Sequence, residues 1–492
     1  MKTKRNTLTA LLLLSVLLVQ LLAACGGKDD AAVTTAAETV PEETEETRLY
    51  ADVPDENLNG WEIHFIAKAV STGSFGVRDV YSEAEDGDLL NDAVFRRNQT
   101  IEEKYNFTIK FTPDPNGAPV SIVQPSILAG DDVYDVYYDG LTKSAPLAVE
   151  GMLYDFYKLK YQDFDMPWWD KAANDDLSLA HKLYFTYGEH MIGPKSGLYC
   201  VIFNKRMAEN YQLGNLYQYV YDNEWTFETF ASLARDVYQD VNNNGMCDPE
   251  DIYGYGTEGN NAYTAIIGCG VKVAGKDEND LPYLTMNTDR GVKAMEVMMA
   301  SIGDKTVTHF TSDIKNVSNV WTEWWSNCFV NDQMLFREGA MHDVPKLRNM
   351  DADFGILPMP KMDSDQDRYY HTLSIWNAAM MAVPITCREV DSTSLVLEVM
   401  ACESMYILTP AYYELQLKTK SARDDESAGM LDIIFASKTF DIGVVFGWGD
   451  LYSIYSGCAT SRNNTFASQY ASKEEAALAA MQKTLDQLAA LE

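Results

Sequence analysis

Two kinds of hydrophobic pattern alternate along the first half of the chain. At 61–69, "WEIHFIAKA", apolar residues recur at every second position and predict a strand, whereas 86–106 places Leu90, Val94 and Ile101 on one face of a helix. By the same criteria we expect strands at 107–111, 132–140, 183–190 and 197–205, and helices at 120–129, 144–151 and, capped by its first serine, 472–491. Strands that alternate with helices indicate an α/β fold, with a sheet flanked by helices on both faces.

The N-terminus has a different pattern, a short apolar run between positive charge and a cysteine. Lys and Arg at 2–5 precede the apolar stretch 11–22, and "LAAC" ends at Cys25. This is the layout of a secretory signal peptide, because the run is short for a membrane span. The motif resembles the bacterial lipobox, which implies that 1–24 is a removed signal peptide and that Cys25 is lipidated. The alternative is an uncleaved anchor with an incidental cysteine.

The segment after this cysteine has no hydrophobic period. Residues 25–56 are rich in Asp, Glu, Ala and Thr, and such a composition buries too little apolar surface to order itself. We therefore expect a lipid-anchored, acidic, disordered linker between the membrane and the remaining chain.

The net charge limits the kinds of molecule that the chain can bind. The chain has 39 Lys and Arg against 73 Asp and Glu, a formal net charge of −34. Such a surface repels nucleic acid and anionic lipid headgroups, so we expect no nucleic-acid partner and a neutral or cationic small ligand. The charge is also explained by solubility alone.

Length and cysteine content add two constraints. One core rarely holds as many residues as the stretch 57–492 contains, so we expect two lobes. Seven cysteines follow Cys25 at scattered spacings and without a CxxC motif, which supports neither a zinc site nor a dithiol redox site. They are either partly bonded as disulfides or, as we favour, mostly free and buried.

Sequence motifs of catalysis are missing from the chain. There is no HExxH, no GxSxG, no P-loop and no GxGxxG after a predicted strand. Carboxylate pairs are too numerous for any one of them to indicate a glycosidase dyad. We expect a protein that is not an enzyme and requires no cofactor. A surface-anchored glycan-active hydrolase and an adhesive lipoprotein are the alternatives.

One loop has the spacing of metal ligands. The stretch "DVNNNGMCDPED" places oxygen-bearing groups at the positions of an EF-hand-like calcium loop, Asp240, Asn242, Asn244, Met246 (through its carbonyl), Asp248 and Asp251. Asp251 replaces the usual bidentate Glu, and no flanking helix pair is evident. The loop is therefore either a structural calcium site or an Asx-rich turn whose side chains bond their own backbone.

Several segments, in their order along the chain, resemble the extracellular solute-binding lipoproteins of ABC importers. They are "DAVFRRNQTIEEKYNFTIK", "YDVYYDG", "MPWWDKAAN", "VIFNKRMAENYQL", "WTFETFASLARDVYQD", "MLFREGAM" and "DFGILPMPK". The late stretch "YYELQLKTKSARDDESAGMLDII" resembles the group found in Gram-positive anaerobes, whose members are usually assigned to sugars. The resemblance implies a monomer on the extracellular face of a Gram-positive cell membrane.

The same resemblance implies a periplasmic-binding-protein-like fold of type II, with maltose-binding-protein-like architecture. Lobe 1 would hold 57–155 and 376–409, and lobe 2 would hold 156–375 and 410–492, with hinge crossings near 153–161, 373–379 and 409–413. The lobes would close on a ligand between them and deliver it to the membrane permease subunits of an ABC transporter. The implied ligand is a sugar or oligosaccharide; a non-sugar solute such as a peptide is the alternative.

Binding a saccharide requires aromatic planes for its ring faces and polar partners for its hydroxyls. Trp448 is the leading candidate, because its flanking glycines would leave the ring uncovered and "FGWGDLYS" resembles a late aromatic segment of the family. Ligands of open α/β sheets bind beyond the carboxyl ends of strands, which adds side chains after two predicted strands. The full set of candidates is Trp448, Asp450, Trp376, Asn377, Tyr138, Asp139, Trp324, Trp325 and Glu189. The alternative is that the aromatic residues pack in the core and Asp139 caps a helix.

Overall fold

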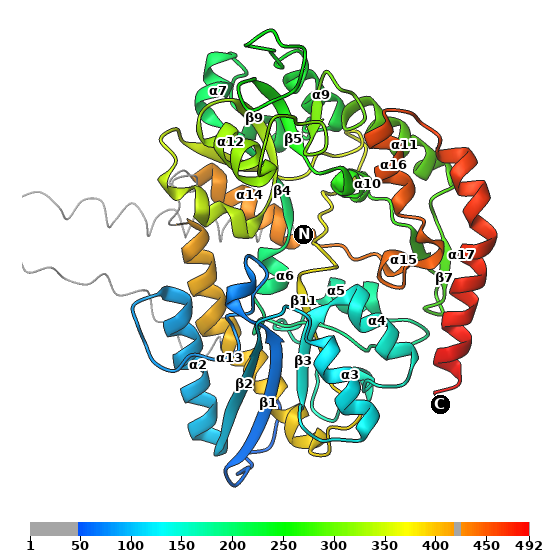
Figure 1. The fold of residues 1–492 in the computed structure, drawn as a ribbon. Helices are drawn as coiled ribbons and strands as arrows, with labels where there is room; N and C mark the ends of the chain where they lie inside the picture. The colour runs from blue at the N-terminus through cyan, green and yellow to red at the C-terminus, as the bar shows by residue number, and fades with distance from the viewer. Residues whose placement is uncertain (1–47, 418–424, 492) are drawn as a thin grey trace, which may run out of the picture. The chain divides into compact units, whose positions relative to one another are not determined.

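The computed structural model describes residues 48–417 and 425–491 (Figure 1). The chain divides into two units, Met1–Leu49 and Tyr50–Glu492, and the description below concerns the second. The expected signal peptide, Cys25 and most of the expected linker lie outside the described residues.

A four-stranded sheet forms one half of this unit. Its strands are β1 (Trp61–Lys68), β2 (Phe107–Asp114), β3 (Val136–Gly140) and β11 (Ala379–Ala382), in the order β11-β3-β1-β2. β1 is parallel to β2 and β3, and β11 is antiparallel to β3. Every residue of β3 is buried, as expected for a central strand that is covered on both faces.

Helices cover this sheet from two sides (Figure 1). α2 (Leu89–Tyr105) packs against α13 (Val390–Leu417), while α3 (Val120–Ala129) and α4 (Leu141–Val149) lie beside β3. α2 begins where the carboxylate of Asp88 accepts hydrogen bonds from two backbone N–H groups of the first turn. α13 is long and apolar enough to span a membrane, but it packs against α2 and is 61% buried over its most apolar window. It is a core helix of this half.

A five-stranded sheet forms the other half. Its strands are β4 (Tyr199–Asn204), β5 (Tyr253–Thr257), β8 (Thr308–Phe310), β9 (Met334–Ala340) and β10 (Phe354–Leu357), in the order β10-β4-β9-β5-β8. β4 is antiparallel to both of its neighbours, and β5 is parallel to β8 and β9. The two mixed sheets with their helices agree with the expected α/β class.

Most of the remaining elements are short. The α-helices are α5 (Lys171–Leu177), α6 (Gly193–Ser196), α7 (Lys205–Asn210), α8 (Leu216–Tyr221), α9 (Phe227–Ala234), α10 (Ala262–Gly268), α11 (Asp289–Ser301), α12 (Asn327–Val330), α14 (Asp425–Ala436), α15 (Ile442–Val445), α16 (Ser453–Ser461) and α17 (Phe466–Ala489). The other elements are the antiparallel pair β6 (Ala274–Lys276) and β7 (Pro282–Leu284), the 3₁₀ turns η2 (Val70–Thr72), η3 (Phe156–Lys158), η4 (Gly259–Asn261), η6 (Met341–Asn349) and η8 (Trp448–Asp450), and the π-helical turn η5 (Trp321–Ser326).

Two elements differ from the sequence predictions. The strand expected at 183–190 is wrong, because this segment makes only isolated bridges, such as that between Thr186 and Met381 of β11. The C-terminal helix begins before Ser472, since Phe466 and Tyr470 are buried and extend its apolar face by more than a turn. Ser472 therefore lies inside α17 and does not cap it.

The predicted lobe boundaries can be compared with the two sheets. All strands of the four-stranded sheet fall within 57–155 and 376–409, and all strands of the five-stranded sheet fall within 156–375. The crossing expected at 409–413 lies inside α13. The lobe boundaries themselves stay a prediction.

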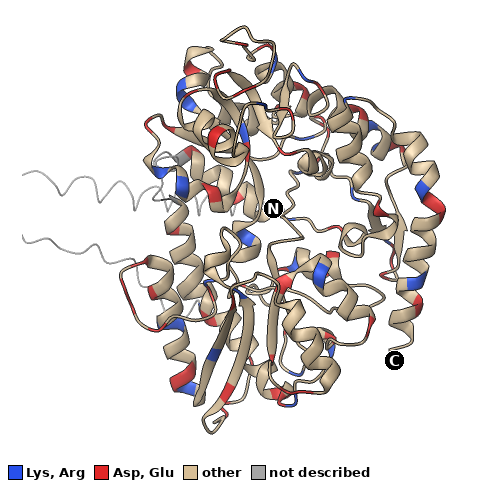
Figure 2. Ribbon diagram, in the orientation of Figure 1, with Lys and Arg blue, Asp and Glu red and all other residues tan. Residues whose placement is uncertain are grey.

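Charges and cysteines are spread through the described part of the chain. Figure 2 shows acidic and basic residues interspersed over most elements.

The seven cysteines after Cys25 are unpaired, and all but Cys247 are buried.

Candidate functional site

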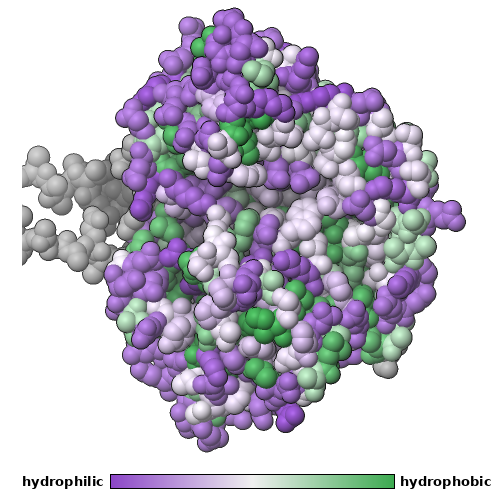
Figure 3. All heavy atoms as spheres, in the orientation of Figure 1, coloured by the Kyte–Doolittle hydropathy of each residue, from purple (hydrophilic) through white to green (hydrophobic). Residues whose placement is uncertain are grey.

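A cleft of about 400 Å³ lies between the two sheets, and we call it the inter-sheet cleft. It is lined by loops that follow the carboxyl ends of β1, β5 and β9, together with η5, the start of β4 and the segment before β11. The space-filling view is hollowed near its middle, between the two halves (Figure 3). The lining residues are Ser74, Phe75, Tyr199, Glu258, Asn261, Trp321, Trp325, Ser326, Glu338, Gly339, Ala340, His342, Asp343, Lys346, Ser374 and Asn377.

Two indole rings form one wall of the inter-sheet cleft. Trp321 and Trp325 lie one turn apart on η5, with ring centroids 5.5 Å apart and planes inclined by 65°. Trp321 is 47% exposed, and Trp325 is half-buried with the guanidinium of Arg337 5.3 Å from its ring centre. π-helical turns of this kind recur at functional sites. The wall offers the planar apolar surface that a sugar ring requires.

Carboxyl groups form a second part of the lining. Glu338 is fully buried and accepts hydrogen bonds from Thr257 Oγ1 at 2.5 Å and Thr264 Oγ1 at 2.6 Å. Burial raises the pKa of Glu338 to about 7 despite these bonds, and burial also raises the pKa of Glu258, which is half-buried. Glu258 is suited to bind hydroxyl groups, whereas both oxygens of Glu338 are already held by the two threonines.

A carboxylate held by two cations forms a third part of the lining. The carboxylate of Asp343 lies 3.5 Å from Arg337 Nη2 and 3.0 Å from Lys346 Nζ. Burial opposes ionisation of Asp343, but these cations outweigh it and hold its pKa below the usual range. Arg337 therefore contacts two lining groups, the ring of Trp325 and the carboxylate of Asp343.

Contacts between the two halves lie beside this carboxylate. Lys346 Nζ donates to Ser74 Oγ at 2.7 Å, and the rings of Phe75 and His342 meet edge to face at 4.8 Å. They join the loop after β1 to η6, so separation of the halves would have to break them.

Two of the residues expected from the sequence line the inter-sheet cleft, Trp325 and Asn377. The backbone oxygen of Asn377 accepts from Lys68 Nζ at 3.2 Å, and the same ammonium lies 3.6 Å from Asp139. Asp139 is fully buried and also accepts from the backbone N–H of Val120, the first residue of α3. Asp139 therefore holds the start of α3 and the ammonium of Lys68, and it does not line the cleft.

The expectation for Trp448 is wrong. Its ring is 1% exposed, stacks on Phe446 with planes inclined by 10°, and donates its N–H to Thr484 Oγ1 at 3.0 Å. The neighbouring Gly449 allows α17 to approach closely, since a Cβ there would lie 2.6 Å from that of Ala477. The glycine therefore serves packing and leaves no free ring face.

The remaining expected residues also lie outside the lining. Asp450 is exposed and pairs with Lys473 at 3.1 Å, and Trp376 packs against Tyr452 with ring centroids 5.3 Å apart. The others are buried or engaged elsewhere: Tyr138 and Trp324 are fully buried, and Glu189 pairs with Lys195 and Thr409.

Sequence reasoning missed most of the lining. Trp321 was recognisable, because it precedes Trp325 by four residues and so shares a helical face with it. Glu258 and Glu338 carry no local signal, since they come together only through the pairing of β5 with β9.

The loop with calcium-like spacing forms an internal hydrogen-bond network. Asp240 accepts from the backbone N–H of Asn244 and Gly245, and Asn244 Nδ2 donates to Asp248 at 2.6 Å. The other candidates make similar bonds: Asn242 donates to Asp248, Met246 N–H to Asn244, and Asp251 accepts from Val241 N–H. Within 48–417 and 425–491, no three His, Cys, Asp or Glu side chains are grouped to hold a metal. These bonds match the Asx-turn interpretation, and calcium binding stays a prediction.

Solved structures with the same fold include substrate-binding proteins of ABC transporters. UspC of M. tuberculosis aligns with a TM-score of 0.55 at 13% identity, over 85% of this chain and 100% of that one. An ABC substrate-binding protein of Listeria monocytogenes aligns with a TM-score of 0.53 at 13% identity, over 87% of this chain and 99% of that one. The galacto-N-biose-/lacto-N-biose I-binding protein of Bifidobacterium longum aligns with a TM-score of 0.52 at 10% identity, over 89% of this chain and 99% of that one. The chain has the fold of ABC-transporter solute-binding proteins. No protein-family model and no curated protein sequence matches it.

The solute-binding-protein fold explains where the cleft lies. Loops beyond the carboxyl ends of strands from both sheets meet there, which is the general position of ligand sites in open α/β sheets. An identity of 10–13% shows the fold alone, so the role of each lining residue rests on the geometry above.

Proposed function

We propose that this chain captures a saccharide in the inter-sheet cleft and delivers it to the permease of an ABC importer. The observation that carries the proposal is the pairing of the Trp321–Trp325 wall with buried carboxyl groups between two α/β halves. Neighbours with this fold were solved with cycloalternan, maltotetraose and lacto-N-biose. All three are neutral saccharides.

Binding would proceed by capture and closure. A saccharide first stacks on the indole wall, and its hydroxyls then engage Glu258. Closing adds contacts from the loop after β1, such as Phe75, so the ligand stabilises the closed form by its extra contacts. In this mechanism the chain alters no bond of the ligand and acts as a binding protein rather than an enzyme.

The location and partners belong to the same proposal. Lipidation of Cys25 would hold the chain as a monomer on the extracellular face of a Gram-positive membrane, next to its permease subunits. The acidic surface favours a small neutral or cationic ligand over nucleic acid.

Calorimetric titration of the full chain in detergent with a panel of oligosaccharides and peptides tests this proposal. We expect one saccharide class to bind, and no cleavage products after prolonged incubation. Trp325→Ala should weaken binding about tenfold, because losing about 60 Å² of apolar stacking costs about 1.5 kcal/mol. Trp376→Ala is the matched control, a half-buried tryptophan outside the cleft, and should leave affinity unchanged. Binding of peptides alone, or cleavage of the sugar, would refute the proposal.

A further inference from the structure

A second cavity, of about 270 Å³, adjoins the inter-sheet cleft, and we call it the apolar pocket. It lies between the loop after β1, the first turn of α2, α6, η6 and the end of α13. The two cavities share four lining residues: Ser74, Phe75, His342 and Lys346.

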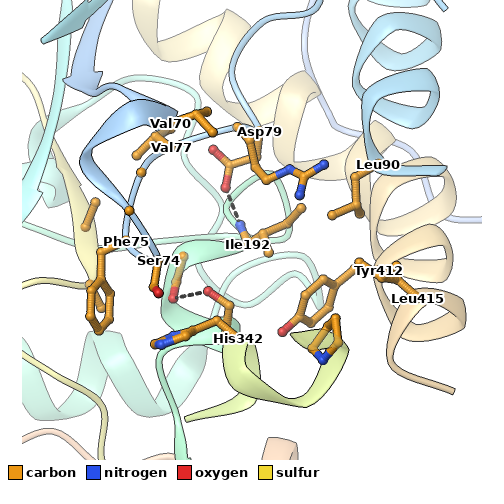
Figure 4. A pocket seen from close by; sticks show the side chains of 18 of the residues that line it. Val70, Ser74, Phe75, Val77, Asp79, Leu90, Ile192, His342, Tyr412 and Leu415 are labelled. Atoms are coloured by element: carbon orange, nitrogen blue, oxygen red, sulfur yellow. Dashed lines mark hydrogen bonds between the residues drawn. The ribbon is translucent and has the colours of Figure 1, made fainter. Parts of the chain in front are cut away.

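The lining of the apolar pocket differs in chemistry from that of the cleft. Its walls are built mainly from Val70, Val77, Leu90, Ile192, Tyr412 and Leu415. Figure 4 shows Tyr412 and Leu415 of α13 on one side, Phe75 and His342 on the other, and Ile192 between them. Leu90, Ile192 and Tyr412 are at most 6% exposed, so these walls are fixed by the core behind them.

The polar groups of the pocket do not call for a charged ligand. One carboxylate oxygen of Asp79 accepts from the backbone N–H of Ile192 at 2.5 Å, and burial raises the pKa of Asp79. Burial likewise lowers the pKa of His342 and so favours its neutral form. The cations at the rim are paired, Arg78 with Asp88 at 2.9 Å and Lys346 with Asp343. The pocket therefore suits an uncharged, apolar group.

The partition between the cavities consists of side chains. It is the edge-to-face contact of Phe75 with His342 and the hydrogen bond from Lys346 to Ser74. Ser74 and Lys346 are exposed, and Phe75 and His342 are only half-buried. Rotation of two side chains would therefore join a polar, aromatic cleft to an apolar chamber, without a change in the sheets.

We propose that this protein binds glycosides whose sugar occupies the inter-sheet cleft and whose apolar aglycone occupies the apolar pocket. The inference rests on the proposed function, since it requires the sugar to lie in the cleft. It extends that function by naming the ligand class as amphipathic: a neutral saccharide with an aryl or short alkyl substituent. A free saccharide would leave the pocket unfilled and bind more weakly.

The test compares free, methyl and phenyl forms of maltose and of lactose by calorimetric titration of the full chain. For the sugar that binds, we expect the phenyl glycoside to bind at least about tenfold more tightly than the methyl glycoside, because the ring leaves water. Leu415→Trp, which fills the pocket from its half-buried side, should bring this ratio to about one while the affinity for the free sugar stays unchanged. Leu128→Trp, at a 70% exposed position on α3, is the matched control and should keep the wild-type ratio.

A second variant tests the same inference in case Leu415→Trp does not fold. Val70→Asp places a carboxylate at the 59% exposed rim of the pocket and should also lower the phenyl-to-methyl ratio. Equal binding of the phenyl and methyl forms by wild type, or an unchanged ratio in both variants, overturns the inference and leaves the proposed function intact. If no saccharide of the oligosaccharide panel binds, the inference fails together with saccharide capture in the cleft.

Discussion

The buried carboxyl of Glu338 makes stability depend on pH in a calculable way. Its pKa rises from 4.5 to about 7 in the folded chain, where it is fully buried beside Thr257 and Thr264. At about 1.4 kcal/mol per pKa unit, this corresponds to about 3 kcal/mol. Because the folded pKa is raised, the stabilising contribution is complete below the unfolded pKa and is lost as pH rises through about 7.

Glu338→Gln isolates this contribution. A glutamine retains an acceptor oxygen, and the two threonine hydroxyls can reorient to donate or accept, so the variant should fold. Urea unfolding at several pH values would give the free energy of unfolding for both chains. We expect the wild type to lose about 2–3 kcal/mol relative to Glu338→Gln between about pH 5 and about pH 8.5. A difference that is flat with pH, or that grows in the opposite sense, would refute the assigned burial of Glu338.

Three further predictions concern other parts of the molecule. Glu398→Gln should cost about 1–3 kcal/mol at neutral pH, because the indole N–H groups of Trp168 and Trp169 donate to different oxygens of Glu398, both at 2.8 Å, and an amide keeps an acceptor at only one of these positions. Urea unfolding measures this cost, and an unchanged midpoint contradicts the prediction. Removing Trp168 or Trp169 should lower thermal stability without changing saccharide affinity per folded molecule, whereas an altered affinity would place them in the site. If the loop at Asp240 binds calcium, millimolar Ca²⁺ should raise the thermal midpoint of wild type but not of Asp240→Ala; equal midpoints leave the Asx-turn interpretation.

The sequence predicted the elements whose signal is local. β1 and α2 follow from alternation and helical spacing over a few residues, and α2 begins at Leu89 after its cap Asp88, within the predicted range. The segment 183–190 has strand-like composition, but its backbone bonds to several partners rather than to one ladder. Which partners it finds depends on residues as distant as Met381.

A site residue could be predicted only where its own secondary-structure element determines the direction of its side chain. Trp325 lines the inter-sheet cleft because η5 directs it there, while the adjacent Trp324 points into the core against Tyr253. Trp448 fails for the opposite reason: its local glycines suggest an open ring, and a helix that begins at Phe466 covers it. A contact with a segment far along the chain therefore decides the outcome for Trp448.

A crystal structure of the chain with its bound saccharide tests the central claim most directly. We predict electron density for a sugar ring stacked on Trp321 or Trp325, with hydroxyls within hydrogen-bonding distance of Glu258. A saccharide bound elsewhere on the surface, beside Asp450 for example, with the inter-sheet cleft filled by side chains, would contradict the account.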